Sequence, residues 1–459
     1  MARDVTDLTP IESRDELVRY LEAGCKPPGS FRVGTEHEKV PFYVADHAPV
    51  PYRGAGPGRG GIADLLSGLQ ARTGWDPIVE AGATIGLHDP VGGGAISLEP
   101  GGQFELSGAP LATIHEAATE LARHLDDVAA VGEPLGLKFL TLGMSPRWTH
   151  AETPVMPKGR YRIMADYMPK VGTRGLDMMF RTGTVQANLD FSDEADMVKK
   201  LRVSLALQPV AAALFANSPF TDGRPNGFLS ARSEIWRDTD NQRSGMLPLA
   251  FEDGFGFERY VDYALQVPMY FVKRGEIYHD VAGQDFRALL AGRLESRPGE
   301  RATLSDWANH LSTLFPEVRL KRYLEMRGCD VGPPAMINAM PALFVGLLYD
   351  RDALEGAWDL VKGWSAAERQ KLRDDVPRQA LAAEIRGRTV RDITRDMLAL
   401  SRAGLVRRGY GDAEGRDESL YLDPLDAIAD GRTQAEAMLT HYNGTWNGSV
   451  DPVFTQYVF

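Results

Sequence analysis

The chain has 459 residues, 43% of them hydrophobic, so it can bury a sizeable core in one large domain or in two or three ordinary ones. Its net charge of −12 disfavours binding of nucleic acid, and it has no run of about 18 apolar residues that would suggest a membrane span. The first residues, 1–17, carry several acids and no apolar signal region. Two cysteines, Cys25 and Cys329, give neither a disulfide framework nor a CxxC metal pattern. We therefore expect a cytoplasmic protein.

The first predicted elements are a helix, a strand and a second helix. Residues 13–24 begin with the capping-box spacing of Ser13 and Glu16 and continue with apolar residues at helical intervals. Residues 32–42 form the predicted strand, and a glycine- and proline-rich run at 53–61 separates it from a helical stretch at 62–72. This run matches GxGxxG, but Pro57 interrupts the motif and no βαβ unit surrounds it. We therefore predict a loop there and no dinucleotide-binding turn.

Later segments predict a sheet whose strands are polar on one face only. Residues 111–132 have the apolar spacing of an amphipathic helix, and residues 138–143 read as a buried strand. Segments 103–107, 184–191 and 320–327 alternate polar and apolar side chains. Because strands of parallel sheets are usually apolar on both faces, we expect a mainly antiparallel or mixed sheet. Helices would cover its apolar face, its polar face would line a cavity, and the chain would be mostly helical from about residue 350.

Strand-borne glutamates are the strongest functional signal in the chain. Glu36 and Glu38 would stand on one face of the first strand, about 6–7 Å apart, where like charges raise each other's pKa unless a positive group lies between them. Further glutamates of this kind are Glu99, Glu105 and Glu325. Carboxylate oxygens without a cluster of Cys or His favour Mg²⁺ or Mn²⁺ over Zn²⁺, and phosphates usually complete the shell of such a Mg²⁺ ion. The sequence therefore predicts a site for divalent cations, whereas a single strand glutamate would be read as a solvated residue. His37 points to the opposite face and is expected to pack.

Basic residues gather in two segments that could bind anions. Guanidinium groups bind carboxylates and phosphates in a bidentate manner and keep their charge. From spacing alone, anion binding and ion pairs with neighbouring aspartates are equal alternatives. The residues are Lys158, Arg160 and Arg162 in the first segment, and Arg232, Arg237 and Arg243 in the second.

Several long motifs together resemble the plant-type glutamate–cysteine ligases and their proteobacterial relatives. The resemblance extends from about residue 13 to the terminal NGTWNGSVDPVF, and its motifs include GTEHEK, SLEPGGQFELSGAPL, VQANLDFS, ALFANSPF and FPEVRLKRYLEMRG. It implies an ATP-dependent ligase that joins the γ-carboxyl group of L-glutamate to the amine of L-cysteine, the first step of glutathione synthesis. It also implies an α+β, glutamine-synthetase-like fold, in which a curved, mainly antiparallel sheet forms an active-site funnel with helices on its outer face. We expect one catalytic domain over residues 1–459.

The resemblance also implies roles for single residues. Arg160 and Arg232 match the glutamate-binding arginines and are candidate catalytic residues, and Gln186 lies where relatives place a polar group close to the metals. Ser230 and Asp190 fall in active-site segments, as a substrate-binding residue and as the candidate base for the cysteine amine. Two or three Mg²⁺ ions, with Mn²⁺ as the alternative, would be held by the family's acidic segments, which match Glu36, Glu38, Glu99, Glu105 and Glu325.

The expected partners are L-glutamate, L-cysteine and ATP, with no nucleic acid and no membrane. Plant members carry two regulatory cysteine pairs, and the corresponding positions here are Ala118 with Asn338 and Val281 with Ser296. We therefore expect a monomer or weak homodimer without redox switching, and a chain without the plant plastid transit sequence. Two alternatives stay open: a ligase of the same fold with another amine acceptor, and a catalytically silent nucleotide or metal sensor.

Overall fold

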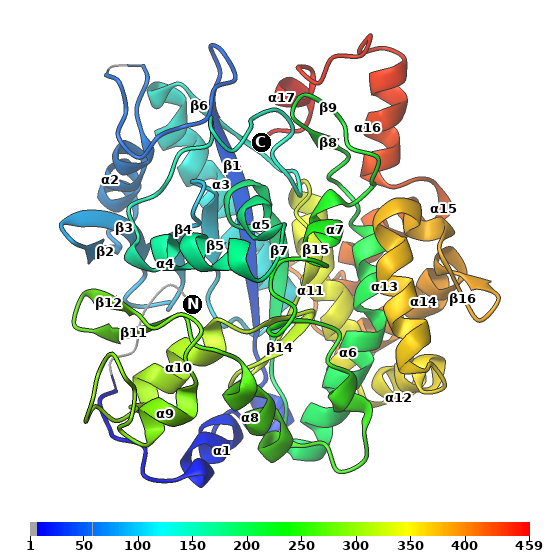
Figure 1. Cartoon of the computed structure of the whole chain (residues 1–459). Helices are drawn as coiled ribbons and strands as arrows, with labels where there is room; N and C mark the ends of the chain where they lie inside the picture. Colours follow the sequence, from blue (N-terminus) through cyan, green and yellow to red (C-terminus); the bar gives the residue numbers. More distant parts are fainter. Residues whose placement is uncertain (1–6, 57) are drawn as a thin grey trace.

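The computed structural model describes residues 7–56 and 58–459, so that Pro57 of the predicted glycine-rich loop and the first six residues lie outside it. The centre of the described structure is a nine-stranded sheet in the order β14–β15–β7–β1–β5–β4–β3–β2, with β6 paired to the far end of β1 (Figure 1). Every pairing in this sheet is antiparallel, as predicted from the one-sided strands. Its strands are β1 (Val33–Tyr43), β2 (Asp76–Glu80), β3 (Ala83–His88), β4 (Ala95–Leu98), β5 (Phe104–Ser107), β6 (Leu137–Leu140), β7 (Thr184–Leu189), β14 (Val318–Leu320) and β15 (Leu324–Asp330).

Helices surround the sheet, and short strand pairs lie between them. The helices are α1 (Arg14–Glu22), α2 (Ile62–Thr73), α3 (Ile114–Gly132), α4 (Gly159–Tyr167), α5 (Gly175–Arg181), α6 (Glu194–Leu214), α7 (Ala231–Ile235), α8 (Phe257–Gln266), α9 (Phe286–Leu290), α10 (Leu304–Ser312), α11 (Pro334–Leu348), α12 (Arg351–Val361), α13 (Ala366–Gln379), α14 (Val390–Arg408), α15 (Asp423–Asp430), α16 (Gln434–Asn443) and α17 (Val453–Gln456). The short pairs are β8 (Phe220–Thr221) with β9 (Arg224–Pro225), β10 (Ser244–Gly245) with β13 (Phe315–Pro316), β11 (Phe271–Arg274) with β12 (Ile277–Asp280), and β16 (Glu384–Ile385) with β17 (Arg388–Thr389).

The three helices predicted near the start of the chain are present as α1, α2 and α3, with small shifts at their ends. Helix α3 begins with a complete capping box, because the Thr113 hydroxyl accepts from the Glu116 amide and the Glu116 carboxylate accepts from the Thr113 amide. At α1, Ser13 occupies the N-cap without accepting from the helix, and its hydroxyl donates to Glu16. The predicted strand at 138–143 ends at Leu140.

The apolar face of the sheet packs against α6 and α11. The alternating residues of β7 and β15 that face these helices are fully buried, for example Val185, Leu189 and Met326. Helices α13 and α14 form a second helical layer against α6 and α11 (Figure 1). The main apolar core runs from Ile11 to Ala435, so the C-terminal helices share it with the sheet.

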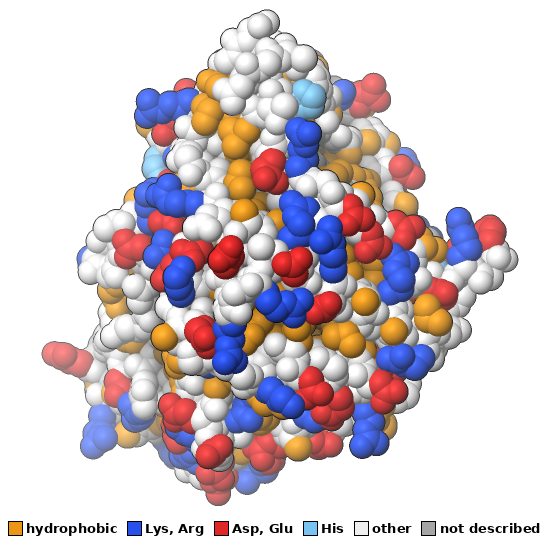
Figure 2. Space-filling view, turned by 90° about the vertical axis from the view of Figure 1, so that its right-hand side faces the viewer, with side chains coloured by type: hydrophobic (Ala, Val, Ile, Leu, Met, Phe, Trp, Pro, Cys, Tyr) orange, Lys and Arg blue, Asp and Glu red, His pale blue; other side chains and the backbone are white. Residues whose placement is uncertain are grey.

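The chain beyond residue 350 is mostly helical, as predicted, with the β16–β17 pair as an exception. Acidic and basic side chains are interspersed on this side of the molecule (Figure 2), where pairs such as Arg388 with Asp396 and Arg395 with Asp430 join them. This mixture is typical of a solvated surface.

Within the described residues, no helix has the length and apolar character needed to cross a membrane.

Helices α11 and α14 approach each other closely at two glycines. A Cβ built on Gly404 would lie 1.9 Å from the backbone oxygen of Gly346. Because the obstacle is backbone, neither helix can relieve the contact by rotating a side chain. The packing of the C-terminal helices against the sheet layer therefore depends on this position having no side chain.

We expect Gly404→Ala to lower the free energy of unfolding by about 1–3 kcal/mol, as overpacking of a tight core does. The measurement is urea denaturation followed by circular dichroism. Gly29→Ala is the matched control, because a Cβ at Gly29 would meet nothing within 4 Å. Equal stability of the two variants would contradict the proposed helix contact.

Candidate active site

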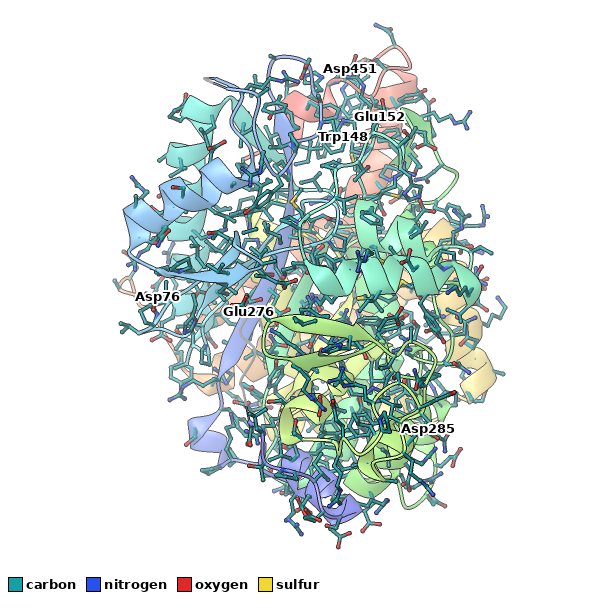
Figure 3. All side chains as sticks on the ribbon, turned by 60° about the vertical axis from the view of Figure 1, so that its left-hand side comes forward. Asp76, Trp148, Glu152, Glu276, Asp285 and Asp451 are labelled. Atoms are coloured by element: carbon teal, nitrogen blue, oxygen red, sulfur yellow. The ribbon has the colours of Figure 1, made fainter. Side chains whose placement is uncertain are left out.

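A cavity of about 900 Å³ lies over the polar face of the sheet. Alternate residues of β1 and β7 line it, including Glu36, Glu38 and Gln186. Helices α4 and α10 and the β11–β12 hairpin complete its walls. Two of its wall residues, Asp76 on β2 and Glu276 in the β11–β12 turn, are labelled in Figure 3. The prediction that the polar strand faces line a cavity is confirmed.

The strand register brings four of the five predicted metal-binding glutamates to this wall. Glu38 of β1 stands directly opposite Glu105 of β5, and Glu36 stands opposite Gln186 of β7. Glu99 follows β4 in a tight turn to β5, closed by the Gly102 amide donating to the Glu99 carbonyl at 2.9 Å. Gly102 has φ +88°, a backbone conformation that favours glycine. The four cavity-wall glutamates, Glu36, Glu38, Glu99 and Glu105, are called the glutamate cluster below.

Negative charge is poorly compensated at two members of the glutamate cluster, Glu38 and Glu105. Burial alone would raise the pKa of Glu36 too, but nearby positive charge, including Lys321, and the Asn188 side-chain amide lower it. Burial and the nearby Glu99 and Glu105 carboxylates raise the pKa of Glu38 well above its usual value. Burial, together with Glu36 and Glu99, raises the pKa of Glu105 to about 7. The Ser97 hydroxyl donates to Glu105 at 2.5 Å and the Thr184 amide donates to Glu38 at 3.1 Å, but these neutral donors do not balance the charges. Buried carboxylates that repel one another suit a hard cation.

Glu325, the fifth predicted metal ligand, is not part of the cavity wall. Its carboxylate is fully buried and forms ion pairs with Arg319 at 2.7 Å, with Lys321 at 2.7 Å and with Arg327. Burial alone would raise the pKa of Glu325, but these three cations hold it well below its usual value. Glu325 is thus paired with cations on both of its oxygens, although it lies near enough to Glu36 for the two carboxylates to repel each other.

The described residues do not contain a finished metal centre. Between residues 7 and 459, Pro57 excepted, no three His, Cys, Asp or Glu side chains are grouped closely enough to hold a metal ion as they stand. The donor set of the glutamate cluster nevertheless fits Mg²⁺ or Mn²⁺ chemically, since it consists of carboxylate oxygens.

His37 packs behind the cluster, as predicted. It lies on the opposite face of β1, where its Nδ1 is 3.2 Å from the Nζ of Lys39 and its ring packs edge-on against His124. Burial, with Lys39 nearby, lowers the pKa of His37 well below its usual value, so this ring stays neutral.

Half of the six basic residues singled out in the sequence line the cavity: Lys158, Arg160 and Arg232. The Lys158 ammonium donates to the Leu98 carbonyl at 2.8 Å, and burial, with Arg160 nearby, lowers its pKa to about 8. The other three lie elsewhere. Arg243 forms a buried ion pair with Asp240 at 2.6 Å, Arg237 pairs with Glu234 and Asp374, and Arg162 lines a separate shallow depression. Ion pairs within the protein thus account for Arg243 and Arg237, and Arg162 lies outside the cavity.

Sequence reasoning gave no role to Trp236, Phe315 and Arg327, which form one corner of the cavity. The Arg327 guanidinium lies 5.9 Å from the Trp236 ring centre and 5.6 Å from that of Phe315. It donates to the Gln186 side chain at 2.9 Å, and its carbonyl accepts from Arg232 at 2.8 Å. The alternation of β15, which places Arg327 on the polar face, was the signal that could have found it.

Asp190 and Ser230 lie outside the cavity wall, so the structure does not bring them together with the other predicted site residues. Asp190 pairs with Lys26 at 2.9 Å and accepts from the Arg32 amide at 2.7 Å. Ser230 is fully buried at the N-cap of α7, and its hydroxyl donates to Asp330. The roles expected for these two residues stay predictions. Lys26, in contrast, does line the cavity.

Comparison with known proteins gives concordant matches. Residues 32–456 match the model of the family described as glutamate-cysteine ligase family 2 (GCS2). The chain is 52% identical over 457 residues to glutamate–cysteine ligase B, chloroplastic, of Oryza sativa subsp. japonica, covering 99% of this chain and 89% of the relative. It is also 52% identical to the chloroplastic glutamate–cysteine ligase of Arabidopsis thaliana, over 97% of this chain and 83% of the relative.

A solved structure shows the same fold. The glutamate–cysteine ligase of Francisella tularensis, in complex with AMP, has a TM-score of 0.52 at 13% identity and covers 93% of this chain and 89% of its own. At that identity the likeness concerns the fold alone. It bears out the predicted fold class, a mainly antiparallel sheet with helices packed on its apolar face.

The prediction of a cytoplasmic location is contradicted by these comparisons. The matched plant relatives are named chloroplastic. The prediction rested on the composition of the first residues and on the small number of cysteines, and neither property determines a compartment.

We expect the same chemical change to have opposite effects on stability at two of these glutamates. Glu38→Gln should raise the free energy of unfolding at pH 8, because the folded state resists ionisation of Glu38 once the pH exceeds its unfolded pKa near 4.5. Glu325→Gln should lower it by about 3–5 kcal/mol, because three buried cations lose their partner. The measurement is urea unfolding with a chelator present.

The pH dependence gives a second check. The gain in unfolding free energy from Glu38→Gln should shrink as the pH falls to 4.5 and below, because the wild-type carboxyl then becomes protonated in the unfolded state as well as in the folded state. The stabilising charge of Glu325 persists down to its lowered pKa, so its variant should stay destabilised in that range. Equal signs for the two variants at pH 8 would refute this description of the charges.

Proposed function

The chain belongs to glutamate-cysteine ligase family 2, and on that premise we propose that the cavity is where it joins the γ-carboxyl group of L-glutamate to the amine of L-cysteine. The product, γ-glutamylcysteine, begins glutathione biosynthesis, and ATP is the co-substrate. The observation that carries the proposal is the family match over residues 32–456, which includes the strands around the glutamate cluster and the helices α4 and α7 that carry Arg160 and Arg232.

The chemistry requires activation of a carboxylate. An amine does not displace oxide from a carboxylate, so the γ-carboxylate oxygen first attacks the γ-phosphorus of ATP, and the bond from that phosphorus to ADP breaks. The cysteine nitrogen then attacks the carbonyl carbon of γ-glutamyl phosphate, and phosphate leaves with the bridging oxygen. The amine must lose its proton in this second step. No covalent bond to the protein is needed, so positioning and electrostatics supply the acceleration.

Cavity arginines are suited to hold the anionic groups. Arg232 is 3% exposed, and Arg160 lies over the Tyr161 ring with 5.2 Å between its guanidinium carbon and the ring centre. Such restrained guanidinium groups bind a carboxylate or phosphate at a small loss of side-chain entropy. Gln186 accepts from Arg327 and so orients a third guanidinium. Asp190 is not used, because it lies behind Lys26.

Mg²⁺, or Mn²⁺ as the alternative, fits the glutamate cluster. Glu36, Glu38, Glu99 and Glu105 would hold it, and the ion, when bound, would neutralise charge on the phosphate oxygens. The raised pKa values of Glu38 and Glu105 support this proposal, since they report repulsion that a cation would relieve. Glu325 could join these ligands only by exchanging its present cations. The number of ions and the oligomeric state stay predictions.

Purified protein should release phosphate from ATP only when both glutamate and an amine acceptor are present. Cysteine, 2-aminobutyrate and unrelated amines, compared as acceptors, separate a glutamate–cysteine ligase from a ligase with another acceptor. A silent sensor would release no phosphate with any of them. Arg232→Lys should lower kcat/KM by about 10- to 100-fold, as loss of a bidentate charged contact does.

Arg237→Lys is the matched control for that variant. Arg237 lies in the same segment, but its guanidinium pairs with Glu234 and Asp374 away from the cavity. Unchanged kcat/KM is expected for this control. Similar losses in both variants would show that the segment matters only for folding.

Magnesium should stabilise the folded protein through the glutamate cluster. At 100 times its dissociation constant, a cation that binds only the folded state adds about 2.7 kcal/mol. We therefore expect Mg²⁺ to raise the unfolding temperature of the wild type and to raise that of Glu38→Gln much less, measured by calorimetry without nucleotide. Glu120→Gln is the control, since Glu120 is half-buried outside the cavity and should keep the full magnesium response.

A further inference from the structure

Asp330 is a buried carboxylate that the reaction chemistry above does not use. It ends β15 with 1% of its surface exposed, and three donors converge on it. Its Oδ2 accepts from the Asn217 amide at 2.9 Å and from the Ser218 hydroxyl at 2.6 Å, and its Oδ1 accepts from the Ser230 hydroxyl at 2.9 Å. A Cβ built on Gly143 would lie 2.3 Å from the Cγ of Asp330. The carboxyl group of Asp330 therefore fits only because position 143 has no side chain.

The two serines bound by Asp330 connect it to the helix that carries Arg232. The Ser218 hydroxyl accepts from the backbone amide of Arg232 at 3.2 Å. Ser230 is the N-cap of α7, and its hydroxyl accepts from the Ser233 amide at 3.2 Å. Asp330 therefore orients both hydroxyl groups at the start of α7, where each satisfies an amide that the helix itself leaves unpaired.

The side chain of Arg232 is tied to the same strand. Its terminal nitrogen donates to the carbonyl of Arg327, three residues before Asp330 on β15. Within the described part of the chain, its Nε is buried without a hydrogen-bond partner, on a residue that lines the cavity. β15 thus fixes the backbone of Arg232 through Asp330 and Ser218, and its guanidinium through the Arg327 carbonyl, while its Nε keeps a donor that no described group accepts.

A helix of five residues, like α7, has little stability of its own. The direction of Arg232 therefore depends on what holds the first turn of α7. A free arginine side chain loses much rotamer entropy on binding, and a guanidinium fixed in advance loses less. An error of about 1 Å at such a group is enough to reduce a catalytic rate strongly.

We propose that Asp330 is a positioning residue, which acts through Ser218 and Ser230 to aim Arg232 at an anionic group of the substrates. This inference rests on the proposed function, since it takes Arg232 as a substrate-binding residue. The group is a carboxylate of glutamate or a phosphate of ATP. Both are oxyanions that a guanidinium binds, and the two Michaelis constants distinguish them.

The test compares Ser218→Ala, Ser218→Thr and Asp330→Asn with the wild type in phosphate-release assays. Ser218→Ala removes the hydroxyl that joins Asp330 to the Arg232 amide, and Ser218→Thr retains one. We expect Ser218→Ala and Asp330→Asn to raise one of the two Michaelis constants, for glutamate or for ATP, about tenfold and to change the other less than twofold. In Ser218→Thr, the affected Michaelis constant should stay close to that of the wild type. A rise for glutamate assigns Arg232 to a carboxylate, and a rise for ATP assigns it to a phosphate.

A double variant with Arg232→Lys and a control variant at an unrelated serine complete the test. Both changes act through one guanidinium. Adding Ser218→Ala to Arg232→Lys should therefore raise the affected Michaelis constant by less than a further factor of two. Ser401→Ala is the control: its hydroxyl is buried against the Leu343 carbonyl between α14 and α11, and its loss should lower stability without changing either Michaelis constant.

Two outcomes would overturn the inference: unchanged Michaelis constants in Ser218→Ala, or full additivity with Arg232→Lys. If Asp330→Asn does not fold, the Ser218 pair decides alone. A wild-type protein that releases no phosphate with glutamate and cysteine would refute the proposed function instead. In that case, limited proteolysis of Ser218→Ala, with cleavage around α7 faster than in Ser401→Ala, would still support the link between Asp330 and this helix, and equal cleavage would refute it.

Discussion

Charge buried in the cavity is the constraint on which the rest of the structure depends. A carboxylate removed from water must find cations or hydrogen-bond donors, or it loses its charge. Glu325 has three cations and stays ionised, whereas Glu38 and Glu105 have mainly neutral donors and one another. The two situations coexist on one sheet face because antiparallel neighbours bring residues from distant parts of the chain into register. This imbalance at Glu38 and Glu105 supports the proposal that a divalent ion binds at the glutamate cluster.

The cavity has a wall and a supporting layer behind it, and both consist of charged residues. Arg232, Arg327 and Lys26 belong to the wall, while Asp330 and Asp190 hold Arg232 and Lys26 from behind. The supporting carboxylates are almost completely buried and bound by several donors. This arrangement explains why residues in conspicuous active-site motifs need not touch a substrate. Such support would lower the loss of side-chain entropy if these long, flexible cations bind anionic substrates, as proposed.

Family membership and geometry complement each other for this chain. The match over residues 32–456 identifies a glutamate–cysteine ligase, and the sheet of this chain brings the strands that line the cavity together. The geometry adds what a match cannot. It shows Glu325 paired with cations, unlike Glu38 and Glu105, and identifies Trp236 and Phe315 as the rings beside Arg327. The compartment, in contrast, was misjudged from composition and was corrected only by the names of relatives.

Local patterns in the sequence determined the elements and the faces of their residues. A period of two placed Glu36 and Glu38 on one face of their strand and Gln186 on the polar face of another, and helical spacing located α1, α2 and α3, because these properties depend on residues close together in the chain. Only the tertiary structure decided which charged groups meet. Ion pairs join Glu325 to Arg319, Asp190 to Lys26 and Arg243 to Asp240, and residue type alone does not distinguish these from ligand-binding groups. Electrostatic partners are chosen by distance in space, and burial, which sets the strength of each pair, exists only once the chain has folded.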